Sequence, residues 1–287
     1  MTRVAGKRRV VLITTIAVAA LAVSVAAWIL LRPASADVMK RFEERVTQRF
    51  PGATVTMLAA DFARVVQPSG LIQDAALAAT DRACHGNPFG CSNAVDALVD
   101  ALGSGVTLVE HPRRAALRAV IVGESAPGYR YGLVTEPLIG ALEIRYALVA
   151  GDTMSFVTLT TANKLGLTPA TLREDAVRQM DADPASALRT LPGEPGIFVA
   201  RGPLDGPSQL LSAQRMKKLA EDIGMAQLYC AIPRRGLLLV AKADAPGLAA
   251  LRTTIAHAAQ PDVRPAYEGV LRYDSAAPEV AALSALN

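Results

Sequence analysis

The strongest constraint on this chain is an uncharged run of 22 residues near its N-terminus, residues 10–31. About 20 apolar residues are enough for a helix to cross a bilayer. Three basic residues, Lys7-Arg8-Arg9, precede the run, and basic flanks stay on the cytoplasmic side of a membrane. The sequence therefore predicts a single-pass anchor in the bacterial cytoplasmic (inner) membrane, with the main part of the chain in the periplasm.

The same segment has a second interpretation, a signal peptide that is removed. Ala34-Ser35-Ala36 matches the pattern of small residues that precedes a cleavage site. However, the apolar run is longer than the roughly 7–15 residues of a signal-peptide core, and Trp28 and Arg32 suit the interfacial end of an anchor. We favour an uncleaved anchor, with residues 1–36 forming a basic stub, a membrane segment and a short linker. Both interpretations predict export.

The excess of basic residues belongs to this leader. Residues 1–36 hold five of the 30 basic residues and none of the 26 acidic ones. The rest of the chain is therefore nearly balanced in charge and lacks the basic surplus that drives binding to a phosphate backbone. We expect no nucleic-acid partner.

Beyond the leader, alternating apolar and polar residues predict short antiparallel hairpins. The clearest lies at 142–159, where residues 142–148 alternate, Gly151-Asp152 makes a turn, and residues 154–159 return as a second strand. Thr168-Pro169 then has the cap-plus-proline form of a helix start. The order of the elements predicts an α+β fold, with antiparallel hairpins and helices packed on one side.

Breaks in this pattern suggest how the exported part is divided. Residues 124–128 form a loop rich in Ser, Pro and Gly and are the best internal boundary. We expect an N-terminal α+β subdomain at 37–124 and a C-terminal α+β subdomain at 125–260. The proline-containing, low-complexity residues 261–287 predict a loose tail.

Export gives the cysteines a specific meaning. Cys84 and Cys91 bracket a turn-rich segment, His85-Gly-Asn-Pro-Phe-Gly90, that can bring the two sulfur atoms together. In an oxidising compartment this pattern predicts a disulfide; the alternatives are two free thiols or a redox-active pair. Cys230 lies in a strand pattern and is expected to be a small core residue.

Metal and cofactor motifs are missing from the sequence. The three histidines, His85, His111 and His257, lie in separate segments without the spacing of metal ligands. No P-loop is present, and no glycine-rich fingerprint opens a helix after a strand. We therefore predict neither a metal site nor a cofactor.

A serine hydrolase is the main alternative that we consider. Ser125 lies in the loop Gly123-Glu-Ser-Ala-Pro-Gly128, and Ser104 lies between two glycines. Either serine could act as a nucleophile, with His257 further along the chain as the base. Neither has the strand-to-helix context that exposes a nucleophilic serine, so we assign no catalytic residue.

Two pairs of adjacent arginines are candidate binding residues. Arg113-Arg114 follows His111-Pro112, and Arg234-Arg235 lies in the tight turn of a predicted hairpin. Guanidinium groups bind carboxylate and phosphate through paired hydrogen bonds. These four residues are thus predicted contacts for an anion or a protein partner.

Several segments resemble the YtpQ-like bacterial family, which is defined by a domain of unknown function. They are Glu136-Pro-Leu-Ile-Gly140, Leu142-Glu-Ile-Arg-Tyr146, Leu159-Thr-Thr-Ala-Asn-Lys-Leu-Gly-Leu167, Leu172-Arg-Glu-Asp-Ala176, residues 208–217 and Ala231-Ile-Pro-Arg-Arg235. The resemblance covers about residues 130–255 and implies no activity. The family tends to have an acid where this chain has Gly236, and its members mostly lack a membrane leader.

These observations favour a membrane-anchored, envelope-facing binding or scaffold module without catalysis. Exposed edge strands and the arginine turns would be its recognition surfaces. We expect its partner to be an envelope protein of unknown identity.

Overall fold

A computed structural model of the protein describes residues 36–59, 61–85, 88–123, 132–182, 188–194, 196–201, 206–258, 267–277 and 283–286. The predicted anchor at 10–31 and the predicted boundary loop at 124–128 lie outside these residues. Within the described part of the chain, no helix is both long and apolar enough to span a membrane.

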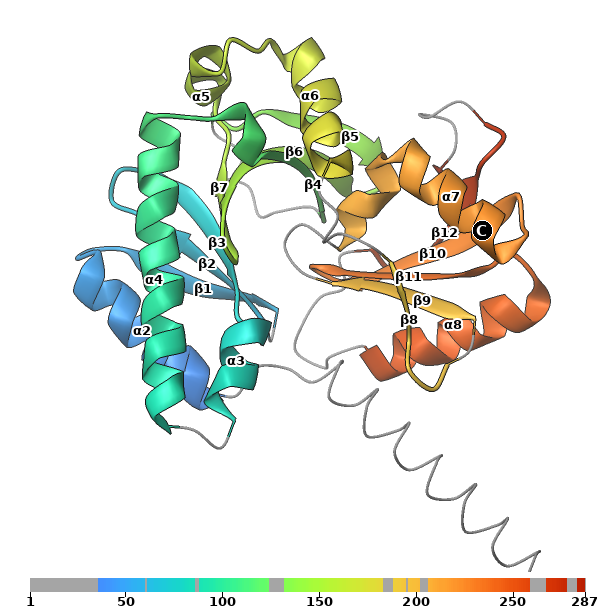
Figure 1. Cartoon of the computed structure of the whole chain (residues 1–287), viewed down its shortest axis with the longest axis horizontal. Helices are drawn as coiled ribbons and strands as arrows, with labels where there is room; N and C mark the ends of the chain where they lie inside the picture. The colour runs from blue at the N-terminus through green and yellow to red at the C-terminus, as the bar shows by residue number, and fades with distance from the viewer. Residues whose placement is uncertain are drawn as a thin grey trace, which may run out of the picture.

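A seven-stranded antiparallel sheet forms the first half of the fold (Figure 1). Its strands are β1 (Thr54–Ala59), β2 (Phe62–Val66), β3 (Ile72–Ala76), β4 (Leu117–Val122), β5 (Thr135–Ile139), β6 (Leu142–Ala150) and β7 (Thr153–Phe156). The order is β1-β2-β3-β7-β6-β4, and β5 also pairs with β6. The predicted hairpin at 142–159 is confirmed as β6–β7, which pair from Ala150–Thr153 to Ala147–Phe156. This sheet takes β1–β4 from the predicted subdomain 37–124 and β5–β7 from the subdomain 125–260.

The second sheet has six strands, again all antiparallel. They are β8 (Arg189–Thr190), β9 (Ile197–Arg201), β10 (Gln227–Arg234), β11 (Leu237–Lys242), β12 (Val270–Asp274) and β13 (Leu283–Leu286), in the order β13-β12-β10-β11-β9-β8. The expectation of a loose tail at 261–287 was therefore wrong for β12 and β13. Alternate residues of β12 enter the core, Leu271 and Tyr273 among them, because β12 pairs with β10 along its length.

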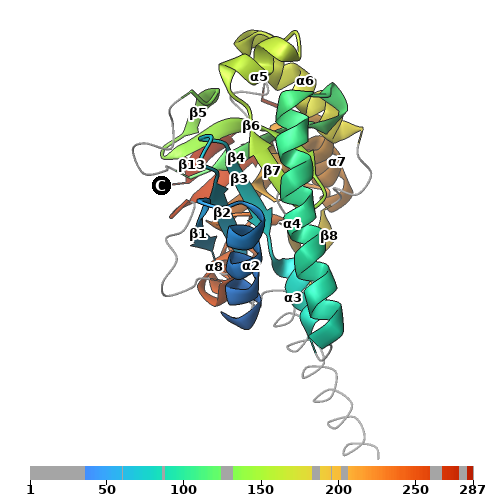
Figure 2. The same ribbon diagram turned by 90° about the vertical axis from the view of Figure 1, so that its left-hand side faces the viewer.

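The helices cover the two sheets differently. They are α2 (Ala36–Arg49), α3 (Ala78–Cys84), α4 (Pro88–Glu110), α5 (Leu159–Lys164), α6 (Pro169–Asp181), α7 (Ala213–Ile223) and α8 (Ala245–Ala258), with 3-10 turns η1 (Arg114–Ala116) and η3 (Pro207–Leu211). Figure 2 shows α2 and α4 in front of the first sheet, on one face of it. In contrast, α7 and α8 cover opposite faces of the second sheet (Figure 1).

The prediction of helices on one side is therefore wrong for the second sheet, although the antiparallel mixture of helices and strands is confirmed. The reason lies in β10 and β11, which are apolar on both faces. Cys230 and Val240 pack in the core with α7, whereas Ala231 and Leu239 pack with α8. A strand that is buried on both faces reads as a continuous apolar run, so its sequence does not say where the helices lie.

The turn between β10 and β11 packs against the uncovered face of the first sheet. Gly236 in this turn has φ of 71°, a conformation that favours glycine. A Cβ atom at Gly236 would lie 2.9 Å from Cζ of Phe62 on β2 and closer still to Cε2. Glycine is thus required here both by the backbone conformation and by the contact between the sheets.

We predict that Gly236→Ala destabilises the fold more than Gly70→Ala does. Gly70 has a similar φ of 83°, but a Cβ atom there would meet nothing within 4 Å. The Gly70 variant isolates the backbone cost of about 1–2 kcal/mol, and the Gly236 variant adds an overlap of about 1–3 kcal/mol. Urea denaturation of the two variants measures the difference. Equal losses in free energy of unfolding would show that the turn does not pack on Phe62.

Candidate functional site

Charged side chains lie buried on the first-sheet face that meets the β10–β11 turn. Arg64 on β2 is directly opposite Asp74 on β3 in the antiparallel register. Its Nε donates to Oδ1 of Asp74 at 2.8 Å, and its Nη2 donates to Oδ2 at 3.1 Å. Arg64 is only 2% exposed and Asp74 is 0% exposed. The sheet therefore holds a bidentate ion pair that is shielded from water.

The β10–β11 turn adds two more arginines to this face. Nη1 of Arg234 donates to Oδ1 of Asp61, and Nη2 of Arg235 forms an ion pair with Oδ2 of Asp74. Asp74 thus accepts from both sheets. The turn is held on the first sheet by charge as well as by the contact of Gly236.

A fourth arginine, Arg145 on β6, completes what we call the arginine cluster, which consists of Arg64, Arg145, Arg234 and Arg235. Its Nη2 donates to Oε2 of Glu143 at 3.1 Å, and the residue is 1% exposed. Glu143 and Arg145 are two residues apart on β6 and so point to the same face.

The ring of Phe156 lies among three of these guanidinium groups. The Cζ atoms of Arg64, Arg145 and Arg235 are 5.6, 5.8 and 5.8 Å from its centroid. At such distances the negative face of an aromatic ring attracts a cation. Phe156 thus fills the space between the cations with a side chain that offsets part of their repulsion.

Burial lowers the pKa values of two arginines in the cluster. Desolvation lowers the pKa of Arg235 to about 10, against the attraction of Asp74. Desolvation also lowers the pKa of Arg145, while its hydrogen bond to Glu143 acts in the opposite direction. The guanidinium of Arg235 remains protonated at neutral pH, so the cluster is cationic under ordinary conditions.

The predicted candidates Arg113, Arg114, Arg234 and Arg235 thus do not form one site. Arg234 and Arg235 were expected at an exposed hairpin tip, but they are buried or nearly buried between the two sheets. Arg114 donates to the carbonyl oxygen of Leu165 at 3.1 Å and so satisfies the end of α5. Arg113 is exposed at the start of η1.

Arg113 lines an open groove at the C-terminal end of α4, with a volume of about 940 Å³. The lining residues come from α4, the segment after it, the end of β6 and the end of α5: Ser104, Thr107, Leu108, Glu110, His111, Pro112, Arg113, Val149, Ala150 and Lys164. Nζ of Lys164 donates to the carbonyl oxygen of Glu110 at 3.2 Å and to that of Val109 at 3.4 Å. A lysine thereby caps the negative end of α4. We call this feature the α4 groove.

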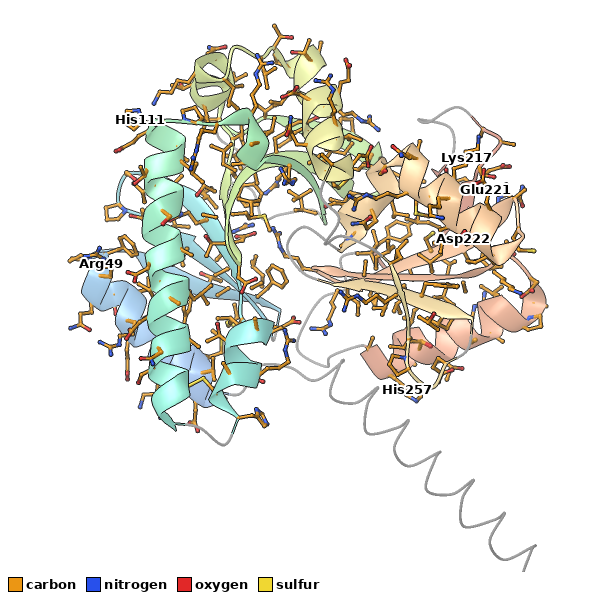
Figure 3. The ribbon with its side chains drawn as sticks, viewed as in Figure 1. Arg49, His111, Lys217, Glu221, Asp222 and His257 are labelled. Carbon is orange, nitrogen blue, oxygen red and sulfur yellow. A yellow bond between two sulfur atoms is a disulfide. The ribbon has the colours of Figure 1, made fainter. Side chains whose placement is uncertain are left out.

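Of the candidate residues of a serine hydrolase, the two that the structure describes, Ser104 and His257, lie far apart (Figure 3). Ser104 lies in the α4 groove and donates to the carbonyl oxygen of Asp100 at 3.1 Å. Figure 3 shows His111 near the end of α4 and His257 far from it, at the end of α8. Ser125 lies outside the described residues. A Ser104–His257 pair would require the two halves of the fold to rearrange.

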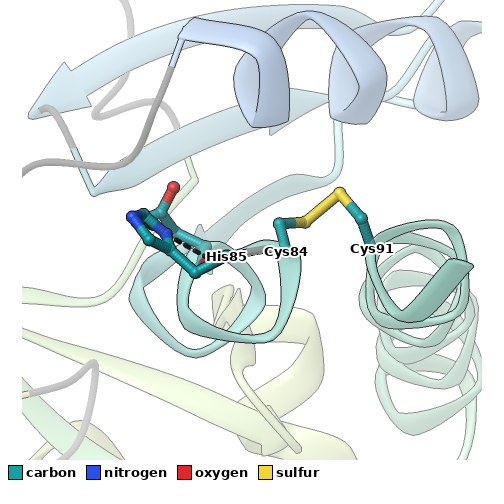
Figure 4. The surroundings of a disulfide bond; sticks show 4 residues. Cys84, His85 and Cys91 are labelled. Carbon is teal, nitrogen blue, oxygen red and sulfur yellow. Dashed lines mark hydrogen bonds and ion pairs between the residues drawn. A yellow bond between two sulfur atoms is a disulfide. The ribbon is translucent and has the colours of Figure 1, made fainter. Parts of the chain in front are cut away.

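The predicted disulfide is confirmed. Cys84 at the end of α3 is bonded to Cys91 in the first turns of α4 (Figure 4). His85 beside the bond is half exposed, with Nδ1 3.9 Å from Oδ2 of Asp81. Among the residues described, no group of three or more His, Cys, Asp and Glu side chains could hold a metal ion. Cys230 is buried as expected, and burial raises the pKa of its thiol.

Sequence reasoning missed Arg64, Asp74 and Arg145. The alternation of β6 assigned Arg145 to a solvent-facing side, because the other side is apolar. The faces are assigned correctly, but the second sheet covers the polar face. The available signal was that Arg64 and Asp74 carry opposite charges on two adjacent predicted strands.

Comparison with models of known protein families, with curated proteins and with solved structures found no match for this chain. The resemblance to the YtpQ-like family therefore stays a prediction.

We predict that Asp74→Asn strongly destabilises the fold. The change removes the carboxylate charge that Arg64 and Arg235 share, and removing one partner of a buried pair costs about 3–5 kcal/mol. The matched control is Asp222→Asn on α7, where both Asp222 and its partner Lys218 are largely exposed. That variant should unfold at nearly the wild-type urea concentration. Similar urea midpoints for Asp74→Asn and Asp222→Asn would contradict the presence of a buried ion pair at Asp74.

A second prediction concerns the three cysteines. In the folded chain no thiol should react with iodoacetamide, because Cys230 is buried and the other two are bonded. Unfolding without reductant should expose one thiol, and unfolding with reductant should expose three. Mass spectrometry of the alkylated chain counts them. Two additional thiols in the unreduced, unfolded chain would mean that Cys84 and Cys91 are not joined.

Proposed function

We propose that this protein is a membrane-anchored, envelope-facing binding module that has no catalytic role and holds an acidic segment of another envelope protein. The observation that carries the proposal is the α4 groove. Its charged lining residues are Arg113, Lys164 and Glu110, all exposed. Cations outnumber anions there, which favours an acidic partner.

The construction of the α4 groove supports a binding role. Its walls include α4, the end of β6 and the end of α5, which are all fixed by the first sheet and its core. Leu108 of α4 and Leu165 after α5 belong to one buried cluster. A groove on rigid elements holds a ligand at a smaller entropic cost than a groove on loops.

The export part of the proposal has two supports. The sequence has an apolar run at 10–31 that suits a membrane anchor. The Cys84–Cys91 bond suits an oxidising compartment, because disulfides persist outside the cytosol and are rare within it. Both observations support the proposal that the main part of the chain is exported.

The proposal predicts crosslinks from the groove to an acidic peptide. A photoreactive amino acid in place of Arg113 should form an adduct with an envelope protein in irradiated intact cells. The matched position is Arg252, which is exposed on α8 and should form none. Mass spectrometry of the adduct should identify a partner segment rich in Asp and Glu.

A charge reversal tests the electrostatic part of the proposal. Lys164→Glu should lower the yield of the Arg113 adduct several-fold, because it replaces attraction by repulsion at the same wall of the groove. The corresponding Lys217→Glu change, at an exposed position on α7, should leave the yield unchanged. Two outcomes would refute the proposed function. One is that positions 113 and 252 give identical adducts; the other is that only uncrosslinked monomer is recovered under conditions that crosslink a control complex.

A further inference from the structure

Arg234 lies in the buried junction between the two sheets, and one edge of its guanidinium group makes no hydrogen bond to any described residue. The residue is only 2% exposed. Its Nη1 donates to Asp61, whereas its Nε and Nη2 have no hydrogen-bond partner in the described part of the chain. Buried donors of a charged group are nearly always satisfied, because an unsatisfied one is costly.

The two free atoms form a single edge of the guanidinium plane. In the same cluster, Arg64 shows how the Nε–Nη2 edge of a guanidinium group binds a carboxylate. There Nε and Nη2 donate side by side to the two oxygens of Asp74, at 2.8 and 3.1 Å. A planar fork of this kind matches the spacing of two oxygens in a carboxylate or phosphate. The free edge of Arg234 thus offers a second fork of the type that Asp74 occupies on Arg64.

The charge of the arginine cluster also fits an added anion. The cluster has four guanidinium groups, and its described partners are three carboxylates, those of Asp61, Asp74 and Glu143. These guanidinium groups lie in a region removed from water, where a positive charge attracts an anion more strongly than it does in water. Arg145 has two more unpartnered donors there, Nε and Nη1.

The site is rigid before any ligand arrives. Gly236, two residues after Arg234, is wedged against Phe62, and a Cβ atom at Gly206 would meet the backbone of Gly236. The turn is therefore fixed from both sides. Preorganisation of this kind lowers the entropic cost of binding.

We propose that Arg234 binds an oxyanion, a carboxylate or phosphate group, on its Nε–Nη2 edge in the junction between the sheets. This site is separate from the α4 groove, and neither proposal depends on the other. Titration calorimetry on the full chain in a neutral maltoside detergent tests it, with inorganic phosphate and acetate as probes and sodium chloride as the salt control. We expect one phosphate or one acetate ion to bind per chain. The probe that binds more tightly shows whether the natural ligand presents a phosphate or a carboxylate group.

Arg234→Lys is the diagnostic variant. A lysine keeps the positive charge that pairs with Asp61 but has no second edge for an oxyanion. Losing the fork should weaken binding about tenfold or more. The matched control is Arg252→Lys, at an exposed position on α8. This variant should bind the probes as the wild type does. Circular dichroism checks that each variant is folded.

Asp61→Asn gives a second measurement if the lysine variant does not fold. Removing this carboxylate leaves the charge of Arg234 uncompensated, so the probe that binds the wild type should bind this variant more tightly. The proposed site is supported if the wild type binds a probe and if that binding is weaker in Arg234→Lys or tighter in Asp61→Asn. No binding of either probe at millimolar concentrations would overturn it. So would unchanged binding in folded Arg234→Lys, or unchanged or weaker binding in Asp61→Asn.

Discussion

The contact between the β10–β11 turn and the first sheet is the interaction on which the rest of the structure depends. It pairs Arg234 with Asp61, residues that are 173 positions apart in the chain, and Arg235 with Asp74. A long loop must close before these pairs can form. A turn docked in any other way would lose the pairs Arg234–Asp61 and Arg235–Asp74, and breaking a buried pair costs about 3–5 kcal/mol. The pairs thus fix how the two sheets are oriented.

Charge at this contact is combined with close packing. Gly236 brings the backbone of the turn against Phe62, and Arg235 lies 5.8 Å from the centroid of the same ring. A bulkier turn residue would lift the arginines away from their carboxylates. No acid is needed in the turn itself for charge pairing, because Asp61 and Asp74 supply the carboxylates.

Local signals in the sequence predicted those elements whose cause is local. The β6–β7 hairpin followed from alternation around Gly151-Asp152, and α6 followed from Thr168, whose side chain caps the helix before Pro169. The disulfide followed from export and a short cysteine loop. β12 could not be predicted in this way, because its pairing partner β10 lies about forty residues earlier and gives no signal within the tail itself. β13 in turn pairs with β12, so it was missed together with that strand.

The arginine cluster was missed for a related reason. Alternation shows that Glu143, Arg145 and Ala147 share one face of β6, but it does not show what covers that face. The cover is a hairpin about ninety residues further along the chain. Polar residues on a strand are expected to face water unless a distant element is known to pack there. For the same reason Arg234 and Arg235 looked like an exposed tip, since their burial is decided by the sheet that they meet.

Strand alternation also explains how one sheet can serve two separate surfaces. On β3, Gln73 donates to the carbonyl oxygen of Leu102 in α4 and to Oγ of Ser155, whereas the next residue, Asp74, faces the arginine cluster. On β7, Ser155 and Phe156 divide in the same way. The helix side positions α4 and thereby its groove, and the opposite side receives the arginine turn. Because neighbouring residues of one rigid strand face both surfaces, substitutions can be directed to either surface while the other keeps its support.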